Sequence, residues 1–305
     1  MADACTYRYV LYGLELVADM AFPELAAAGP SSLGKLEVRH GAVPDTLGPG
    51  TEMMPGLHMA GRQCLFTFDG PVAFLVEDGE RITVAPRQGA VLSDVRLFVL
   101  GSAIAVALHQ RGDLPLHVSG VVGPGGVVAF TGPSGAGKST MATELHRQTG
   151  WPLFCDDVAV LRLEAGRPML YGGVRRVKLW RDAALRFGLD PSEMARDYSR
   201  ADKFHAGLDA AFAQPRQAMT HLFQLEQGTQ VQQRRVSGRE KLEVLSGAVY
   251  RPQFFRAYAE GRDVFALLAG VAAGLEIGLL SRPLDEGGLN ASVQAVTELV
   301  SGVPV

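Results

Sequence analysis

The sequence predicts an α/β protein in which a small β-rich N-terminal domain (residues 1–91) precedes a larger mixed domain (residues 92–305). Three observations predict this architecture. Short runs in the N-terminal region alternate large apolar residues with other residues, as half-buried strands do. A long apolar helical pattern begins at Asp94. Beyond it, a strand pattern leads directly into a glycine-rich loop and a second helical pattern, an order typical of α/β folds.

Turn residues separate the strand-like runs of the N-terminal domain. Asp69-Gly70 lies between two of them, and an Asp-Gly pair ending at Gly79 lies between two more. The stretch Gly29–Gly56 is rich in glycine and proline, so we expect a loop there. The runs themselves are Thr6–Val17, Cys64–Phe68, Val72–Val76 and Arg81–Ala85.

The larger domain is expected to begin with the apolar helix Asp94–His109, for which Ser93 offers the hydroxyl of an N-cap. Strands are expected at Leu114–Val122 and Val127–Thr131, on either side of a glycine-rich turn. The further expected elements are a helix Thr140–Thr149, a strand Pro152–Cys155, a hairpin of Val158–Leu163 and Pro168–Tyr171, a polar surface segment over the site at residues 190–215, and a buried helix followed by a strand within Val264–Leu280.

Composition excludes several classes of function. The chain has 305 residues, 47% of them hydrophobic, and a formal net charge of −3 without a basic tract, so we expect no nucleic-acid partner. The longest apolar run, Val264–Leu280, contains a glutamate and is short for a membrane span, so we expect no membrane partner. The three cysteines are scattered, and the N-terminus lacks a signal-peptide pattern, which favours a reducing cytoplasm. A homo-oligomer is compatible with the sequence.

The glycine-rich segment Gly132–Ser139 reads Gly-Pro-Ser-Gly-Ala-Gly-Lys-Ser, a complete phosphate-binding loop. Glycines allow successive backbone N–H groups to point at one anion, and the following helix adds its positive end. Lys138 would reach the β- and γ-phosphates, and the Ser139 hydroxyl would bind Mg²⁺. The pattern therefore predicts a bound nucleoside triphosphate, ATP, with contacts from Gly132, Pro133, Ser134, Gly135, Ala136, Gly137, Lys138, Ser139 and Thr140.

An acidic pair, Asp156 and Asp157, follows the next strand pattern after this loop. A strand that ends beside the phosphate loop would bring both carboxylates to the Mg²⁺ side of the nucleotide. One carboxylate could hold the metal while its neighbour accepts the proton of an attacking hydroxyl. The alternative is a solvated acidic turn.

His117 precedes the strand that leads into the loop. Taken alone, it fits a hydrogen-bonded core histidine better than a functional one. Cys155 adjoins Asp156, but no second cysteine lies nearby to complete a metal site.

Three segments in order together resemble the catalytic core of the HPr kinase/phosphorylase family: Leu116–Val122, Gly132–Thr140 and Leu153–Val158. The resemblance implies a P-loop kinase core of the HPr kinase and phosphoenolpyruvate carboxykinase type. It also implies that His117 pairs with Asp156, that Asp156 is the base for a serine hydroxyl, and that Asp157 and Ser139 hold Mg²⁺. His117 thereby becomes a candidate site residue.

The sequence also resembles, over nearly its whole length, the smaller HPr-kinase-like proteins associated with lasso peptide biosynthesis. The segments that carry this resemblance are Tyr7–Leu14, Phe22–Leu25, Leu97–Gly101, Val174–Trp180 and Asp202-Lys203. It implies phosphorylation of the C-terminal serine of a precursor peptide. The N-terminal region departs from the bifunctional HPr enzymes, and their signature for dephosphorylation is not found after the acidic pair.

Three basic residues are candidates for contacts with phosphate or substrate. Arg176 and Lys178 share one face of a strand-like run, where they could stabilise the transferring phosphoryl group or bind a C-terminal carboxylate. A solvated strand face is the alternative. Lys203 could close over the phosphates or simply be exposed.

The sequence thus predicts an ATP- and Mg²⁺-dependent serine kinase whose acceptor is a peptide or protein, most specifically a lasso precursor. One alternative is a kinase for an HPr-like carrier protein or a small metabolite. The other is a module that senses ATP without turnover. His117, Asp156 and Asp157 disfavour that second alternative, because binding alone needs no hydroxyl base.

Overall fold

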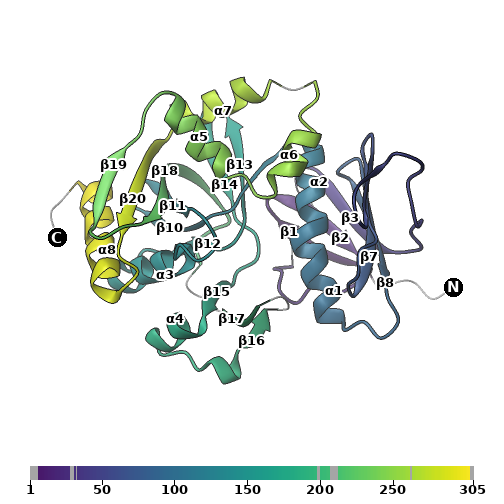
Figure 1. The fold of residues 1–305 in the computed structure, drawn as a ribbon, viewed down its shortest axis with the longest axis horizontal. Coiled ribbons are helices and arrows are strands. Elements are labelled where there is room, and N and C mark those ends of the chain that lie inside the picture. Colours follow the sequence, from purple (N-terminus) through teal and green to yellow (C-terminus); the bar gives the residue numbers. More distant parts are fainter. Residues whose placement is uncertain are drawn as a thin grey trace. The chain divides into compact units, whose positions relative to one another are not determined.

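The computed structural model describes residues 6–27, 31, 33–197, 200–206, 212–261 and 263–302. Contacts divide the chain into two units. Unit 1 comprises Met1–Pro115 and Gln253–Glu260, and unit 2 comprises Leu116–Pro252 and Gly261–Val305. The protein is a mixed α/β protein, as the sequence predicts, with sheets and helices in both units (Figure 1).

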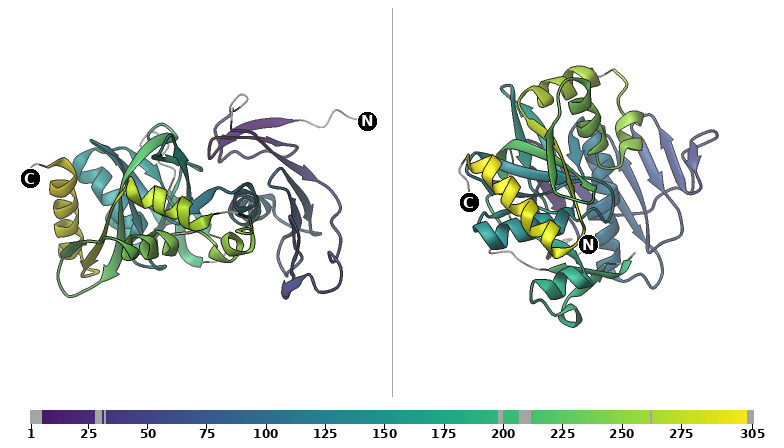
Figure 2. Two further views of the ribbon diagram at one scale, coloured as in Figure 1. Left: turned by 90° about the horizontal axis from the view of Figure 1, so that it is seen from above. Right: turned by 60° about the vertical axis from the view of Figure 1, so that its left-hand side comes forward.

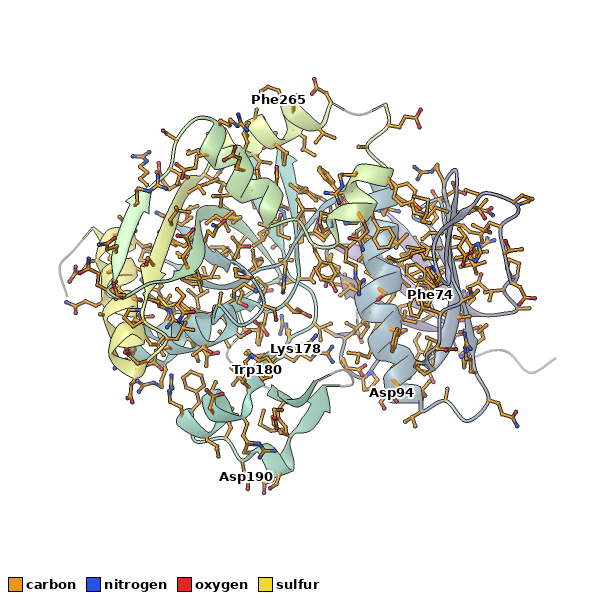
Figure 3. The ribbon with its side chains drawn as sticks, in the orientation of Figure 1. Phe74, Asp94, Lys178, Trp180, Asp190 and Phe265 are labelled. Atoms are coloured by element: carbon orange, nitrogen blue, oxygen red, sulfur yellow. The ribbon has the colours of Figure 1, made fainter. Side chains whose placement is uncertain are left out.

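Unit 1 is built on an eight-stranded sheet with the order β1-β2-β3-β8-β7-β6-β5-β4. Alternating apolar residues bury one face of strands such as β3 and β8, and the ring of Phe74 in β7, labelled in Figure 3, is fully buried. Each expected strand run contains a strand, but the run Thr6–Val17 is a hairpin of two strands with a turn at Tyr12-Gly13 rather than one strand. The strands are β1 (Tyr7–Leu11), β2 (Leu14–Ala18), β3 (Lys35–His40), β4 (Glu52–Met54), β5 (Leu57–Ala60), β6 (Gln63–Phe66), β7 (Val72–Glu77) and β8 (Arg81–Pro86).

The loop expected in this unit is partly wrong. The stretch Gly29–Gly56 is not a loop throughout, because it contains β3 and β4. In β3 the residues Leu36 and Val38 alternate with charged residues and are almost fully buried between β2 and β8. The burial of these two apolar side chains outweighs the loop preference of the glycines and prolines around them.

The apolar helix of unit 1 consists of α1 (Leu92–Phe98), a π-helical turn η1 (Val99–Ala103) and α2 (Ile104–Arg111). Val91 rather than Ser93 is its N-cap, without a side-chain hydrogen bond, so the expected Ser93 cap is wrong. The helix packs on β7 and β8. By length and hydropathy Leu92–Arg111 could span a membrane, but 61% of its most apolar 18-residue stretch is buried inside the structure.

This packing differs from the domain boundary expected at residue 91. The contacts group residues 92–115 with unit 1, because the helix covers that unit's sheet. A second addition to unit 1 comes from α6 (Pro252–Ala257), whose Phe254 ring lies 5.9 Å from that of Phe66. The chain passes into unit 2 through β9 (Leu114–Leu116).

Unit 2 contains three parallel strands in the middle of its large sheet. β11 (Gly126–Thr131) pairs in parallel with β18 (Arg216–Gln227), and β18 pairs in parallel with β20 (Glu276–Arg282). The carboxyl ends of all three therefore lie at one edge of the sheet, the usual ligand-binding edge of α/β sheets. The remaining strands of the sheet are β9, β10 (Ser119–Gly123), β12 (Leu153–Cys155), β13 (Ala159–Glu164), β14 (Arg167–Tyr171) and β19 (Gln232–Arg235).

Two helices of unit 2, α3 (Lys138–Thr149) and α8 (Glu286–Ser301), lie side by side over this sheet (Figures 1 and 2). Their apolar residues share one buried cluster with Phe130 of β11 and Phe223 of β18, which fixes α3 at the end of β11. The helix and the strand expected within Val264–Leu280 are present as α7 (Val264–Ala273) and β20, but the expected burial of the helix is wrong, because only Leu268, Val271 and Ala272 of α7 are buried. A further helix, α5 (Arg239–Gly247), packs against α7 and β20.

A separate three-stranded sheet, β15-β17-β16, completes unit 2. The polar segment 190–215, expected to be a surface segment over the site, contains two of these strands in its described part. Residues 198–199 and 207–211 lie outside the described part. The elements here are β15 (Val177–Trp180), α4 (Arg181–Arg186), the 3-10 turn η2 (Pro191–Glu193), β16 (Ala195–Asp197) and β17 (Arg200–Ala206).

Candidate functional site

The glycine-rich loop joins the end of β11 to the start of α3, as the sequence predicts. Gly132, Gly135 and Gly137 all have positive φ angles, of 139°, 89° and 88°, which side chains strain to adopt. Pro133, Ser134 and Gly135 are exposed at the tip. The first turn of α3 has N–H groups without partners in the helix, so a positive helix end faces the space beside the loop. Ser139 and Thr140, both half-buried, belong to that turn.

Lys138 is 8% exposed, and its ammonium group bends back onto the loop. Its Nζ donates to the carbonyl oxygens of Gly132 at 2.9 Å and Pro133 at 3.3 Å. The loop thus keeps a desolvated positive charge beside the helix N-terminus, which favours an anion at this position.

Asp156 follows β12 and is 8% exposed. The Ser119 hydroxyl donates to its Oδ1 at 2.5 Å, and the backbone N–H of Lys178 donates to its Oδ2 at 2.6 Å. β12 pairs with β10, which in turn pairs with β11, both antiparallel. The ends of β11 and β12 therefore point the same way with one strand between them, about 10 Å apart.

Asp157 has a left-handed backbone, with φ of 75°, which is unusual for a residue other than glycine and is often found at functional sites. Its Oδ2 accepts from Lys178 Nζ at 2.6 Å, and its Oδ1 lies 3.5 Å from His117 Nε2. Burial raises the pKa of the Asp157 carboxyl, but the hydrogen bond from His117 and the charge of Lys178 outweigh it and hold that pKa well below its usual range.

The expected pairing of His117 with Asp156 is therefore wrong: the histidine contacts Asp157. The left-handed backbone at Asp157 turns the two neighbouring carboxylates toward different partners. His117 is 37% exposed at its side chain rather than a core residue. Its carbonyl oxygen accepts from the Thr131 hydroxyl at 3.3 Å, which ties it to the residue just before the glycine loop.

Two residues of this site were not singled out from the sequence. Ser119 fixes one oxygen of Asp156, and its position two residues after His117, on the same face of an extended segment, is the signal that could have found it. Tyr250 places its ring against that of His117, with centroids 5.8 Å apart. Tyr250 comes from a distant segment, and no sequence pattern links it to His117.

The basic candidates differ in their placement. Lys178, labelled in Figure 3, lies on β15, contacts both aspartates and is 14% exposed at its side chain. Arg176 precedes β15 and is half-buried, so it does not share the strand with Lys178 as expected. The backbone of Lys203 lies in β17 opposite Trp180, and its side chain is outside the described part of the structure.

Oxygen ligands suited to Mg²⁺ are present. Mg²⁺ is usually held by one or two carboxylates together with phosphate oxygens, and the ionised Asp157 and the Ser139 hydroxyl fit that requirement. Among the described residues no group of three or more His, Cys, Asp or Glu side chains could hold a metal without phosphate. Burial and the charge of Asp156 raise the pKa of the Cys155 thiol, which disfavours a thiolate ligand there.

The site therefore combines a loop for an anion, a buried ammonium group, two fixed carboxylates and a histidine at one edge of the sheet. No family model matches the sequence, and no curated protein matches it. Among solved structures, an HPr(Ser) kinase/phosphatase from Coxiella burnetii is similar to 62% of this chain and 97% of its own length, with 14% identity and a TM-score of 0.34. The resemblance seen in the sequence thus stays a prediction.

Proposed function

We propose that this protein transfers the γ-phosphoryl group of ATP to a serine hydroxyl. The observation that carries the proposal is the grouping, within unit 2, of the glycine loop and Lys138 with Asp156, Asp157 and His117. A binding site for phosphates needs only the loop and the lysine. The two carboxylates and the histidine add groups that can hold a metal and accept a proton.

In the proposed reaction, the loop and Lys138 bind the β- and γ-phosphates. Asp156 accepts the proton of the serine hydroxyl as the serine oxygen attacks the γ-phosphorus, while the bond from the γ-phosphorus to the β–γ bridging oxygen breaks and ADP leaves. The two hydrogen bonds to Asp156 support this role, because they hold the carboxylate in one orientation and leave a lone pair free on each oxygen. Asp157 and Ser139 would hold Mg²⁺, which supplies charge neutralisation at the phosphates when bound.

We propose a peptide or protein as the acceptor, and specifically the C-terminal serine of a lasso peptide precursor. Arg176, which is half-buried just before β15, supports an acceptor that carries an anionic group next to its hydroxyl, whereas the Lys178 ammonium is already paired with Asp157. A free C-terminal carboxylate meets that description.

The proposal is tested by mass spectrometry of peptides incubated with the protein and Mg-ATP. The peptides end in serine, alanine or serine amide. We expect a gain of one phosphate on the peptide with a free C-terminal serine alone. Phosphate on the serine amide as well would remove the carboxylate requirement, and no transfer to any peptide would overturn the peptide acceptor.

The same experiment addresses the two alternatives. ATP consumed in a bacterial extract but not with peptides would favour a carrier protein or metabolite as acceptor. ATP bound tightly without turnover under any condition would favour a sensing module.

A further inference from the structure

A buried arginine lies directly against the glycine loop. Arg282 is the last residue of β20 and is 3% exposed, so its guanidinium is almost fully removed from water. Its Nη2 lies 3.5 Å from the carbonyl oxygen of Ala136, and its Nη1 donates to that of Pro283 at 3.1 Å. A Cβ atom added to Gly137 would lie 2.3 Å from Nη2. The guanidinium therefore packs on the backbone just before Lys138.

The charge of this arginine is not balanced within the described part of the chain. Its partners there are carbonyl oxygens, no carboxylate lies within 4.0 Å, and its Nε has no hydrogen-bond partner. Burial and the positive charge of Arg186 lower the pKa of the Arg282 guanidinium, and the negative charge of Asp285 offsets this in part. Buried charges are normally paired with a counter-charge or bound to a ligand, because an isolated one is costly.

The topology points this charge toward a phosphate ligand. Arg282 lies at the carboxyl end of β20, and β20 runs parallel to β18, which runs parallel to β11. Arg282 therefore reaches the same sheet edge as the glycine loop, together with Lys138 and the N-terminus of α3. Three sources of positive potential thus meet at one loop, and Lys138 and Arg282 both have carbonyl oxygens as their hydrogen-bond partners there.

We propose that Arg282 is a second positively charged residue of the phosphate site, which positions the Ala136–Gly137 turn and has its charge balanced by the nucleotide phosphates. This inference rests on the proposed function, since it presumes a nucleotide at the glycine loop. Arg282 is a positioning residue: it acts through the loop and through its charge. Its replacement should therefore change the affinity for phosphates more than it changes the fold.

The test compares Arg282→Met, which keeps an unbranched side chain without the charge, with Arg282→Lys, which keeps the charge. The matched control is Arg234→Gln, at an exposed arginine whose charge is already paired with Glu240. Each variant is titrated calorimetrically with Mg-ATP and with inorganic tripolyphosphate. Tripolyphosphate has no base or ribose, so a loss of affinity that is the same for both ligands arises from the phosphate contacts.

We expect Arg282→Met to bind both ligands about 10-fold or more weakly than the wild type does. Arg282→Lys should lose less affinity, and the control should bind both ligands as the wild type does. Without ligand, Arg282→Met should melt no lower than the wild type, but Mg-ATP should raise its melting temperature less. A purely structural arginine would give the reverse: a lower melting temperature and an unchanged affinity in both Arg282 variants. That result would overturn the inference alone, whereas a wild type that binds neither ligand would overturn it together with the proposed function.

Discussion

Buried polar side chains have different surroundings in the two units. In unit 1, Gln110 is fully buried, and its side-chain amide forms hydrogen bonds within the fold. Its Nε2 donates to the Arg62 carbonyl oxygen at 2.9 Å and to the Tyr258 hydroxyl at 3.1 Å, and its Oε1 accepts from Gly79 N at 2.7 Å. These contacts join α2 to the β5–β6 turn, the β7–β8 turn and the residue that follows α6, and the group is uncharged. Gln110 is therefore a structural residue.

In unit 2, the buried polar residues of the candidate site are charged and gather at one edge of one sheet. Lys138, Asp156 and Arg282 are each at least nine-tenths buried. The two cations have loop carbonyl oxygens as hydrogen-bond partners, and the carboxylate is held by uncharged donors. Buried charges need a counter-charge or a ligand to offset the loss of solvation, so a group of them at one sheet edge indicates function rather than folding. The predictions that follow test this difference, from the largest expected effect to the smallest.

Asp156→Asn should have the largest effect. The amide keeps the size of the side chain but cannot accept the proton of a serine hydroxyl. Phosphoryl transfer should fall by about 10²- to 10⁴-fold, with Mg-ATP affinity within a few-fold of the wild type. Transfer is measured on the serine-ending peptide and affinity by calorimetry. An equal loss of both would contradict the assignment of Asp156 as the base.

Gly137→Ala should destabilise the protein more than Gly135→Ala. Both glycines have nearly the same φ, 88° and 89°, so the backbone cost of about 1–2 kcal/mol is shared. At Gly135 the added methyl group meets open space, whereas at Gly137 it meets the buried Arg282. The extra cost of overpacking is about 1–3 kcal/mol, measurable by urea unfolding. Equal destabilisation would mean that Arg282 moves away freely.

Gln110→Ala should destabilise the protein by about 1–3 kcal/mol, because it leaves the buried N–H of Gly79 without its acceptor. The affinity for Mg-ATP of the folded variant should not change. Urea unfolding and calorimetry check the two halves of this prediction. A loss of ATP affinity in the folded variant would remove the distinction between the two kinds of buried polar residue.

Asp157→Asn should change how stability depends on pH. The pKa of Asp157 in the folded protein lies below its usual value of about 3.9, so the ionised carboxylate stabilises the fold at neutral pH. That contribution is complete above the unfolded-state pKa and is lost as pH falls through the folded-state pKa. The difference in unfolding free energy between wild type and variant should therefore shrink between about pH 5 and pH 2. A difference that stays constant over this range would contradict the ion pair with Lys178.

Much of the fold and part of the site can be predicted from the sequence. The glycine loop is specified locally, because its glycines meet positive φ angles and its lysine begins a helix. The elements on either side were likewise predicted from local periodicity. β3 was missed because its burial depends on β2 and β8, which no local pattern reveals.

The finer geometry of the site depends on tertiary structure. His117 contacts Asp157 rather than Asp156, and Asp157 has a left-handed backbone, of which an Asp-Asp sequence gives no sign. Arg282 is distant from the loop in sequence and reaches it only because three parallel strands end together. In both cases the residue types were visible in the sequence, but their neighbours were not.

The most direct test of the central claim is the affinity for Mg-ATP of the wild type, Lys138→Met and Gln110→Ala, measured side by side by calorimetry on folded protein. If the charged groups of unit 2 form a nucleotide-phosphate site, the wild type and Gln110→Ala will bind Mg-ATP equally, and Lys138→Met will bind at least about 10-fold more weakly. Equal binding by Lys138→Met and the wild type, or no binding by the wild type, would contradict that claim.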